Sequence, residues 1–248
     1  MRKTAKLICL LFVSAALALS VFGARIPPFF VDCVVALGRE EGVPPVWATE
    51  ASGFLYGVPQ DNETEVTKHQ YAVYLVTNRH VLTNHSEIEI RLNSQKETDP
   101  VREFTLALKN PDGSDLWVSH PNPSVDVSVV RVNASYLREQ GLQSAFFGAD
   151  FHAADKEKMK EIGMAIGDDV FVPGFPMGIS GTLQRNYVIA RRGSIARLDD
   201  ALSTSASTFL IDALIFPGNS GGPVVSAPVF DAIQGTKTQD RPYLLNVE

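Results

Sequence analysis

Cysteine is scarce in this 248-residue chain, which contains only Cys9 and Cys33. Cys9 lies in an apolar N-terminal stretch, so the rest of the chain has a single thiol and no partner for an internal disulfide. Secreted animal domains are usually rich in disulfides, and a bacterial periplasmic or cell-envelope protein fits this composition better. Cys33 lies among apolar residues and is expected to be a small buried hydrophobic side chain rather than a nucleophile.

Positive charge and metal-binding patterns are also scarce. The chain has 22 Lys and Arg against 28 Asp and Glu, a net charge of −6, and no basic stripe, which argues against nucleic acid as a partner. His80 and His85 lie close in sequence but lack companion ligands, so we expect no metal site. We expect no cofactor either.

The N-terminal residues differ in character from the rest of the chain. Cations come first, at Arg2, Lys3 and Lys6, and an uncharged run then spans Leu7–Phe22. This arrangement is typical of a secretory signal peptide, so residues 1–23 are predicted to be a cleaved signal and the protein to be exported to the periplasm, cell envelope or extracellular space. Retention as a membrane anchor is the alternative, although about 20 apolar residues are needed to span comfortably.

Most of the remaining chain is typical of short β-strands. Segments rich in Val and Ile are separated by clusters of Gly, Pro, Asn and Asp, which predicts an all-β sandwich or barrel. These segments lie at 33–38, 72–78, 87–92, 104–108, 125–132, 169–175, 186–198, 207–213 and 223–225. The charged stretch 154–163 is different: Asp155 as N-cap and Gly163 at the end predict a short helix between two β units.

The stretch FPGNSGGPVV at 216–225 has too few side chains to serve packing. Gly, Asn, Ser and Pro are the usual residues of a surface turn, and a plain turn is one interpretation. The other interpretation is a backbone that holds the Ser220 hydroxyl beside free N–H groups. A serine hydroxyl needs a base to take its proton and an acid to orient that base, so this interpretation depends on suitable partners elsewhere.

His80 is the candidate base, because it follows the apolar strand AVYLVTN at a rigid strand end. The other histidines lie in polar loops, at His69, His85, His120 and His152. Asp126 is the candidate acid: its valine neighbours favour burial, and a buried carboxylate must be paired or hydrogen-bonded. A surface histidine and an exposed aspartate at a strand edge are the alternatives for these two positions.

With His80, Asp126 and Ser220 in this order, the chain resembles a trypsin- or chymotrypsin-like serine peptidase, in the branch near the bacterial Deg-type proteases. TNRHVL resembles the histidine motif of that family, VDVSVVRV its aspartate motif and IDALIFPGNSGGPVV its serine motif. The segments at 167–178 and 190–198 resemble parts of its second barrel. GNSGG also fits the nucleophile elbow of α/β-hydrolases, but those enzymes place a histidine after the serine, and none follows Ser220.

The resemblance implies an all-β, chymotrypsin-like fold of two antiparallel β-barrels of the six-stranded type. Residues 27–140 would form the first barrel and carry His80 and Asp126. Residues 141–165 would form a connector with the short helix, and residues 166–248 the second barrel with Ser220. Few residues follow Pro223 in this sequence, whereas the family fold needs two more strands and a helix, so we expect the second barrel to be incomplete at its C-terminus.

The resemblance also implies a reaction. Ser220 would attack a peptide carbonyl, His80 would take its proton, and Asp126 would hold the imidazole. The oxyanion hole is expected in the loop of Gly218, Asn219 and Ser220, with the N–H groups of Gly218 and Ser220 as donors.

Leu214, a few residues before the serine, is expected at the base of the substrate pocket, where it would favour small or medium apolar side chains. Digestive relatives have Asp directly before the serine, and Asn219 here implies that zymogen cleavage of their type does not occur.

Two hypotheses of function remain open. The first is an exported serine endopeptidase that acts on proteins or peptides, with membrane contact only if the signal segment is retained. The second is a catalytically inactive, peptidase-like binding or scaffold protein, disabled by a missing C-terminal strand and helix.

Overall fold

The structure, a computed structural model, describes residues 26–245 apart from 45, 62, 64, 66, 67, 183, 204, 205, 207, 230–236, 238 and 240. The predicted signal peptide, residues 1–23, lies outside the described residues, and so do residues 246–248 at the end of the predicted second barrel. Within the described ranges, no helix has both the length and the apolar character that a membrane crossing requires.

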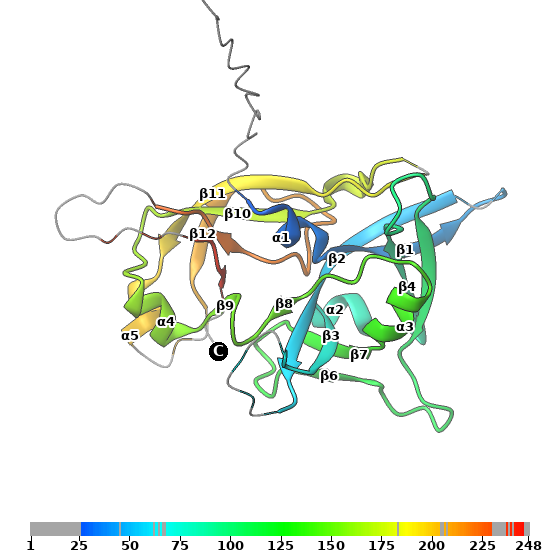
Figure 1. Ribbon diagram of the computed structural model, residues 1–248, viewed down its shortest axis with the longest axis horizontal. Coiled ribbons are helices and arrows are strands. Elements are labelled where there is room, and N and C mark those ends of the chain that lie inside the picture. The colour runs from blue at the N-terminus through cyan, green and yellow to red at the C-terminus, as the bar shows by residue number, and fades with distance from the viewer. Residues whose placement is uncertain are drawn as a thin grey trace, which may run out of the picture.

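Two β-sheets form the framework of the described chain, and Figure 1 shows them side by side. The first sheet has eight strands in the order β5-β4-β1-β2-β3-β7-β6, with β8 paired in parallel to β2. Its strands are β1 (Val34–Glu41), β2 (Val46–Pro59), β3 (Tyr71–Thr77), β4 (Glu87–Leu92), β5 (Arg102–Ala107), β6 (Trp117–Ser119), β7 (Ser128–Val132) and β8 (Phe147–Gly148).

The second sheet has six strands in the order β12-β11-β10-β13-β14-β9. Its strands are β9 (Ala153–Ala154), β10 (Asp169–Gly174), β11 (Ile189–Arg197), β12 (Leu210–Ala213), β13 (Val225–Ser226) and β14 (Leu244–Leu245). Antiparallel pairs join β12 through to β14, and β9 adds to β14 in parallel. The connector that carries β8 and β9 runs between the two sheets, so its ends belong to different sheets.

The helices are short. They are α1 (Pro28–Asp32), α2 (Arg79–Leu82), α3 (Ala134–Glu139), α4 (Lys156–Glu161), α5 (Asp199–Ser203) and the 3-10 helix η2 (Pro176–Gly178). The predicted connector helix is confirmed as α4: the Asp155 side chain accepts the Lys158 N–H at 2.8 Å, and Gly163 follows the helix with φ +72°. A side-chain cap of this kind satisfies one of the free N–H groups at the start of a helix.

Each sheet has its own apolar core, and a further cluster joins the sheets. The first core centres on fully buried leucines such as Leu37, Leu55 and Leu75. The joining cluster contains Cys33 and Phe147 on the first sheet's side and Val225 on the second. Cys33 is fully buried, as predicted, and burial raises the pKa of its thiol well above the ordinary value. A buried, protonated thiol of this kind is unreactive.

The all-β prediction is therefore confirmed, with one difference in strand number. The first sheet exceeds the expected six strands because two short ones, β6 and β8, add to the set of β1–β5 and β7. The longest strand, β2 (Val46–Pro59), is absent from the predicted segments. Its sequence, VWATEASGFLYGVP, contains two glycines, a serine and a glutamate instead of a Val- and Ile-rich run.

Candidate active site

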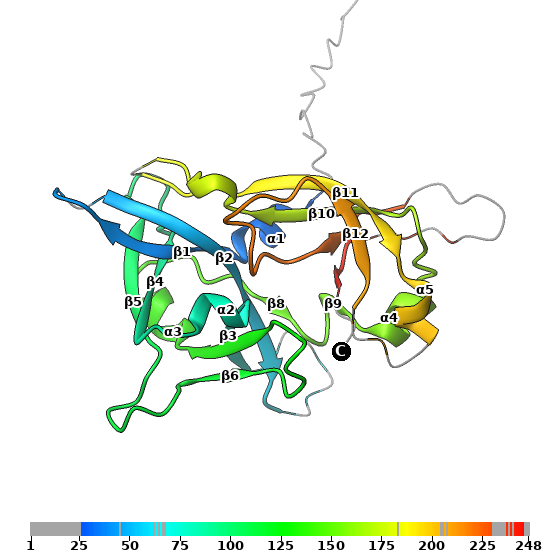
Figure 2. The ribbon, with the colours of Figure 1, turned by 180° about the vertical axis from the view of Figure 1, so that it is seen from behind.

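His80 lies in the first turn of α2, directly after β3, and α2 lies beside β2 and β3 in both views (Figures 1 and 2). The two residues that follow β3 donate hydrogen bonds to the backbone carbonyl of Asp126. The Asn78 side-chain amide donates to the Asp126 carbonyl at 2.6 Å, and the Arg79 N–H donates to it at 3.3 Å. The position of His80 relative to Asp126 is thus set by two contacts besides their own.

The Asp126 carboxylate holds His80 at two points. Its Oδ2 lies 2.5 Å from His80 Nδ1, and its Oδ1 accepts the His80 backbone N–H at 3.0 Å. Burial raises the pKa of Asp126, but hydrogen bonds from the His80 side chain and backbone, and nearby positive charge, bring that pKa below its ordinary value. The carboxylate therefore stays ionised and accepts the Nδ1 proton, which leaves His80 Nε2 as the basic nitrogen.

The prediction that Asp126 lies on a buried strand is wrong. The strand β7 begins at Ser128, so Asp126 precedes it, and the Asp126 side chain is 42% exposed. Its neighbour Val127 is 40% exposed as well. The Asp126 carboxylate is therefore not buried among valines, and its hydrogen-bond partner, His80, comes from α2.

The loop around Ser220 requires glycine at two positions. Gly218 has φ +96°, and a Cβ there would come within 2.4 Å of the Phe175 carbonyl oxygen. Gly221 has φ +82°, and its Cβ would lie 2.1 Å from Thr77 Oγ1. Both angles favour glycine. The second contact shows that the loop packs directly against the last residue of β3, three residues before His80.

The carbonyl groups of residues 217–220 all accept hydrogen bonds. Hydrogen bonds run from Met177 N–H to Pro217 O at 2.6 Å, from Ser52 Oγ–H to Gly218 O at 2.7 Å, from Gly222 N–H to Asn219 O at 2.9 Å, and from Ser52 N–H to Ser220 O at 2.9 Å. In contrast, the N–H groups of Gly218 and Ser220 donate to no acceptor within the described part of the chain. Two amides in one tight loop are thus available to a negatively charged oxygen.

Asn219, the third residue predicted for the oxyanion hole, is used inside the loop. Its backbone N–H donates to the Phe216 carbonyl at 3.0 Å, and its Oδ1 accepts the Phe216 N–H at 3.2 Å. The side chain is 4% exposed, so it does not reach solvent from this position. Gly218 and Ser220 are therefore the donors that the geometry offers.

A cavity of about 390 Å³ is lined by sequence neighbours of the three predicted catalytic residues, although none of the three lines it. Its lining includes Asn78, two residues before His80, Val125 and Val127 on either side of Asp126, and Gly221 directly after Ser220. Residues far apart in sequence thus converge on one hollow of the size that small ligands occupy. Between Ser220 Oγ and the His80 ring, no hydrogen bond is present among the residues that the structure describes.

The predicted substrate-pocket residue, Leu214, lies between β12 and the Ser220 loop. Leu214 is 69% exposed, and the next residue, Ile215, is 51% exposed. Two exposed apolar side chains so close to the loop are available for contact with a substrate. The role of Leu214 stays a prediction.

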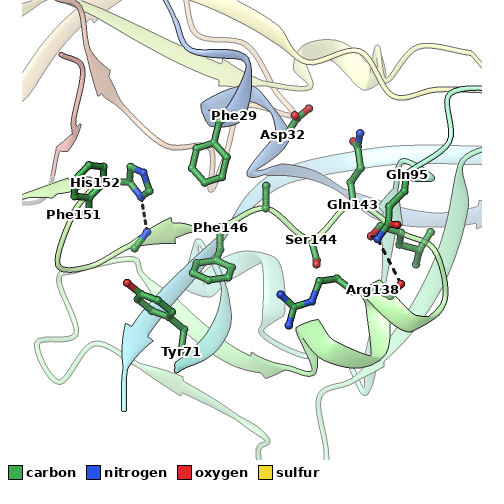
Figure 3. Close-up of a pocket in the computed structure, with 13 residues that line it drawn as sticks. Phe29, Asp32, Tyr71, Gln95, Arg138, Gln143, Ser144, Phe146, Phe151 and His152 are labelled. Atoms are coloured by element: carbon green, nitrogen blue, oxygen red, sulfur yellow. Dashed lines mark hydrogen bonds between the residues drawn. The ribbon is translucent and has the colours of Figure 1, made fainter. Parts of the chain in front are cut away.

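Two other histidines are engaged elsewhere. His69 Nδ1 lies 2.8 Å from Asp150 Oδ2 and its Nε2 lies 2.6 Å from the Glu63 carbonyl oxygen. His152 Nδ1 accepts the Gly148 N–H at 2.8 Å (Figure 3). Within the described ranges, no group of three or more His, Cys, Asp or Glu is placed to hold a metal ion.

Comparisons with known proteins bear on this site. The profile of the trypsin-like peptidase domain matches residues 51–228. No curated protein matches the chain.

Two solved structures are similar to this chain at low identity. The first is the MamO protease domain from Magnetospirillum magneticum in its apo form, with 17% identity, a TM-score of 0.47, and coverage of 88% of this chain and 93% of that chain. The second is the Rv3671c protease in an inactive form, with 17% identity, a TM-score of 0.40, and coverage of 79% of this chain and 72% of that chain.

Proposed function

Because the chain belongs to the trypsin-like peptidase family, whose profile covers more than half of it, we propose that it is a serine endopeptidase. Ser220 is the nucleophile, His80 the general base, and Asp126 the residue that orients His80. The observation that carries the proposal is the backbone of the Ser220 loop. Its carbonyl groups are held by partners while the N–H groups of Gly218 and Ser220 stay available, next to a strand end with an oriented His–Asp pair.

The proposed reaction passes through an acyl-enzyme. Ser220 Oγ attacks the carbonyl carbon of the peptide bond, and His80 Nε2 takes the hydroxyl proton. His80 then gives this proton to the leaving amine, and water hydrolyses the ester on Ser220 by the same steps. Asp126 stays ionised throughout, in accord with its lowered pKa, and stabilises the positive charge that develops on His80.

The two available N–H groups supply the electrostatic part of catalysis. The tetrahedral intermediate carries a negative charge on the former carbonyl oxygen, and the amides of Gly218 and Ser220 would donate to it. One such donor typically stabilises the transition state by about 3 kcal/mol. Because neighbouring carbonyls are already bound, these donors need little rearrangement before the reaction.

The substrates we propose are proteins or peptides with a small or medium apolar residue before the cleaved bond. The exposed side chains of Leu214 and Ile215 beside the Ser220 loop support an apolar contact. Export is proposed from the N-terminal sequence alone, with its three cations and uncharged run.

Hydrolysis of a quenched-fluorescent peptide library tests this proposal. The wild-type chain is expected to cleave a subset of peptides after apolar residues, and the Ser220→Ala variant to cleave none of them. Cleavage that persists in Ser220→Ala would assign the activity to a contaminant or to another residue. Cleavage after Lys or Arg alone would remove the proposed role of Leu214.

An inactive binding or scaffold protein is the second candidate. The observation that favours it is that no hydrogen bond joins Ser220 Oγ to His80 among the described residues. Catalytic hydrogen bonds are often long before substrate binds, so this geometry is compatible with both candidates. A wild-type chain that binds peptides, as measured by fluorescence anisotropy, and cleaves none of the library would establish the second one.

A further inference from the structure

Ser52 is the residue that holds the Ser220 loop in place from the other sheet. It lies in β2 of the first sheet and is fully buried. Its N–H donates to the Ser220 carbonyl at 2.9 Å, and its hydroxyl donates to the Gly218 carbonyl at 2.7 Å. One side chain and one backbone amide thus bind the loop on both sides of Asn219.

These two bonds fix the peptide units on either side of the unit that carries the Ser220 N–H. In a trans peptide the C=O and N–H point in opposite directions, so a bound carbonyl fixes its whole unit. Ser52 holds the units 218–219 and 220–221, and the unit between them carries the Ser220 N–H. A flip of that amide away from the substrate would break the bond from the Gly222 N–H to the Asn219 carbonyl, and the held outer units limit how far the backbone can shift to permit it.

Ser52 also connects the loop to the elements on either side of it. Its hydroxyl accepts the Phe175 N–H at 2.9 Å, just after β10 of the second sheet. Its carbonyl accepts the Thr77 hydroxyl at 2.8 Å, at the end of the strand that leads to His80. The residue therefore touches the nucleophile loop, the second sheet and the His80 strand at once.

We propose that Ser52 is a positioning residue: it sets the orientation of the Ser220 amide relative to His80. The inference rests on the proposed peptidase function, since positioning matters only if Ser220 reacts. A buried serine that contributes to stability alone is the alternative. The difference is that a positioning residue affects turnover in a protein that is still folded.

Ser226 provides a matched control. It is 1% exposed, lies in β13 of the second sheet, and its hydroxyl accepts the Gln239 side-chain amide at 2.6 Å and the Tyr243 N–H at 2.9 Å. Ser52→Ala and Ser226→Ala each remove a buried hydroxyl with two hydrogen bonds to other residues, so both should lower the thermal midpoint.

The kinetic test compares these variants well below their midpoints. A misplacement of about 1 Å can cost about 10²-fold in rate, so we expect Ser52→Ala to lower kcat about 10- to 100-fold with little change in KM. Ser226→Ala should keep kcat near the wild-type value. Equal kcat values in both variants would overturn the positioning role. If Ser52→Ala does not fold, Ser52→Cys, which keeps a weak donor, should still show reduced kcat, and wild-type kcat in it would overturn the proposal.

Amide hydrogen exchange gives a readout that needs no activity. In Ser52→Ala, the N–H groups of Phe175, Asn219 and Gly222 should exchange faster than in wild type, because the loop opens more easily. In Ser226→Ala they should exchange at the wild-type rate. If the wild-type chain neither cleaves peptides nor reacts at Ser220, the peptidase function fails while exchange still shows whether Ser52 holds the loop. Unchanged exchange in Ser52→Ala would overturn the proposal whatever the activity.

Discussion

Two His–Asp pairs in this molecule have similar short contacts and very different surroundings. In the proposed active site, His80 Nδ1 lies 2.5 Å from Asp126, and the two side chains are 59% and 42% exposed. At the connector, His69 Nδ1 lies 2.8 Å from Asp150, and the side chains are 10% and 19% exposed. The pairs therefore differ in access to solvent and substrate rather than in the contact itself.

The two pairs differ in whether the second ring nitrogen of the histidine, Nε2, has a hydrogen-bond partner. His69 Nε2 is occupied by the Glu63 carbonyl, and the Tyr71 hydroxyl donates to Asp150 at 2.9 Å. Within the described residues, His80 Nε2 has no hydrogen bond. A general base needs one nitrogen oriented by an acid and the other free to take a proton. A His–Asp contact alone therefore does not identify a catalytic pair.

Replacement of the two histidines should give the largest contrast. His80→Ala removes the proposed base, and kcat for the best library peptide should fall about 10⁴-fold or more. His69→Ala leaves the proposed base in place and should change kcat little, although it lowers the thermal midpoint. Both variants are measured beside wild type at one temperature. Near-normal turnover in His80→Ala would transfer the role of base to another histidine, with His120 the first to replace.

Replacement of the two carboxylates should give a slightly smaller contrast. Asp126→Asn keeps the shape of the side chain but favours the wrong tautomer of His80, and kcat should fall about 10³- to 10⁴-fold. Asp150→Asn alters the connector and should leave kcat within a few-fold of wild type. Equal losses in the two variants would show that the connector pair affects the active site as strongly as Asp126 does.

The His69–Asp150 pair should make the stability of the fold depend on pH. The Glu63 carbonyl raises the pKa of His69 above its ordinary value near 6.5; burial lowers it, and hydrogen bonding and charge from Asp150 and charge from Asp61 raise it further. The pKa of Tyr71, which faces the same carboxylate, is raised to about 12 by burial and by Asp150, so Tyr71 stays neutral. A group with a raised folded-state pKa stabilises the fold fully below its unfolded pKa, and this contribution disappears as the pH rises through the folded-state pKa.

Thermal midpoints of wild type and His69→Gln between pH 5.5 and 8.5 measure this effect. We expect the difference between the two midpoints to be largest at pH 5.5 and to shrink as the pH rises. A difference that is constant or grows with pH would contradict the account of His69.

His152, at the other end of the same connector, should show a smaller effect of opposite sign. Figure 3 shows its ring near Phe29 and Phe151, with Nδ1 bound to the Gly148 N–H. Burial lowers the pKa of His152; the Asp150 charge opposes this, and the Arg241 charge adds to it. Its contribution to stability is therefore complete above pH 6.5 and is lost as the pH falls toward its lowered folded-state pKa. The difference in thermal midpoint between wild type and His152→Gln should narrow from pH 7.5 to pH 5. A difference that widens would show that the pKa of His152 is not lowered in the folded state.

The sequence could reveal the proposed site because its signals are local. The motifs around His80, Asp126 and Ser220 each lie within a few residues, and the α4 helix depends on a cap three residues from its partner. Glycines at positions 218 and 221 are required by local positive φ angles. Such features follow from short-range geometry and can be predicted without a structure.

Contacts between distant segments could not be predicted in the same way. Ser52 lies 166 residues from Gly218 and in a long strand that lacks a Val- and Ile-rich pattern. His69 and Asp150 are 81 residues apart, and no motif indicates their contact. The prediction that Asp126 is buried was wrong for a related reason. The strand β7 begins after Asp126, and its hydrogen-bond partner, His80, comes from another segment.

Covalent labelling with a fluorophosphonate tests the central claim most directly. Attack by Ser220 Oγ on phosphorus would release fluoride and leave a phosphonate ester, while His80 takes the hydroxyl proton. If Ser220 is the nucleophile, mass spectrometry of the labelled wild-type chain should find the probe on Ser220 and on no other serine. Ser220→Ala should then be unlabelled, and His80→Ala should react far more slowly than His69→Ala. A wild-type chain that stays unlabelled while folded, or one labelled equally well in Ser220→Ala, would contradict the assignment of Ser220 as the nucleophile.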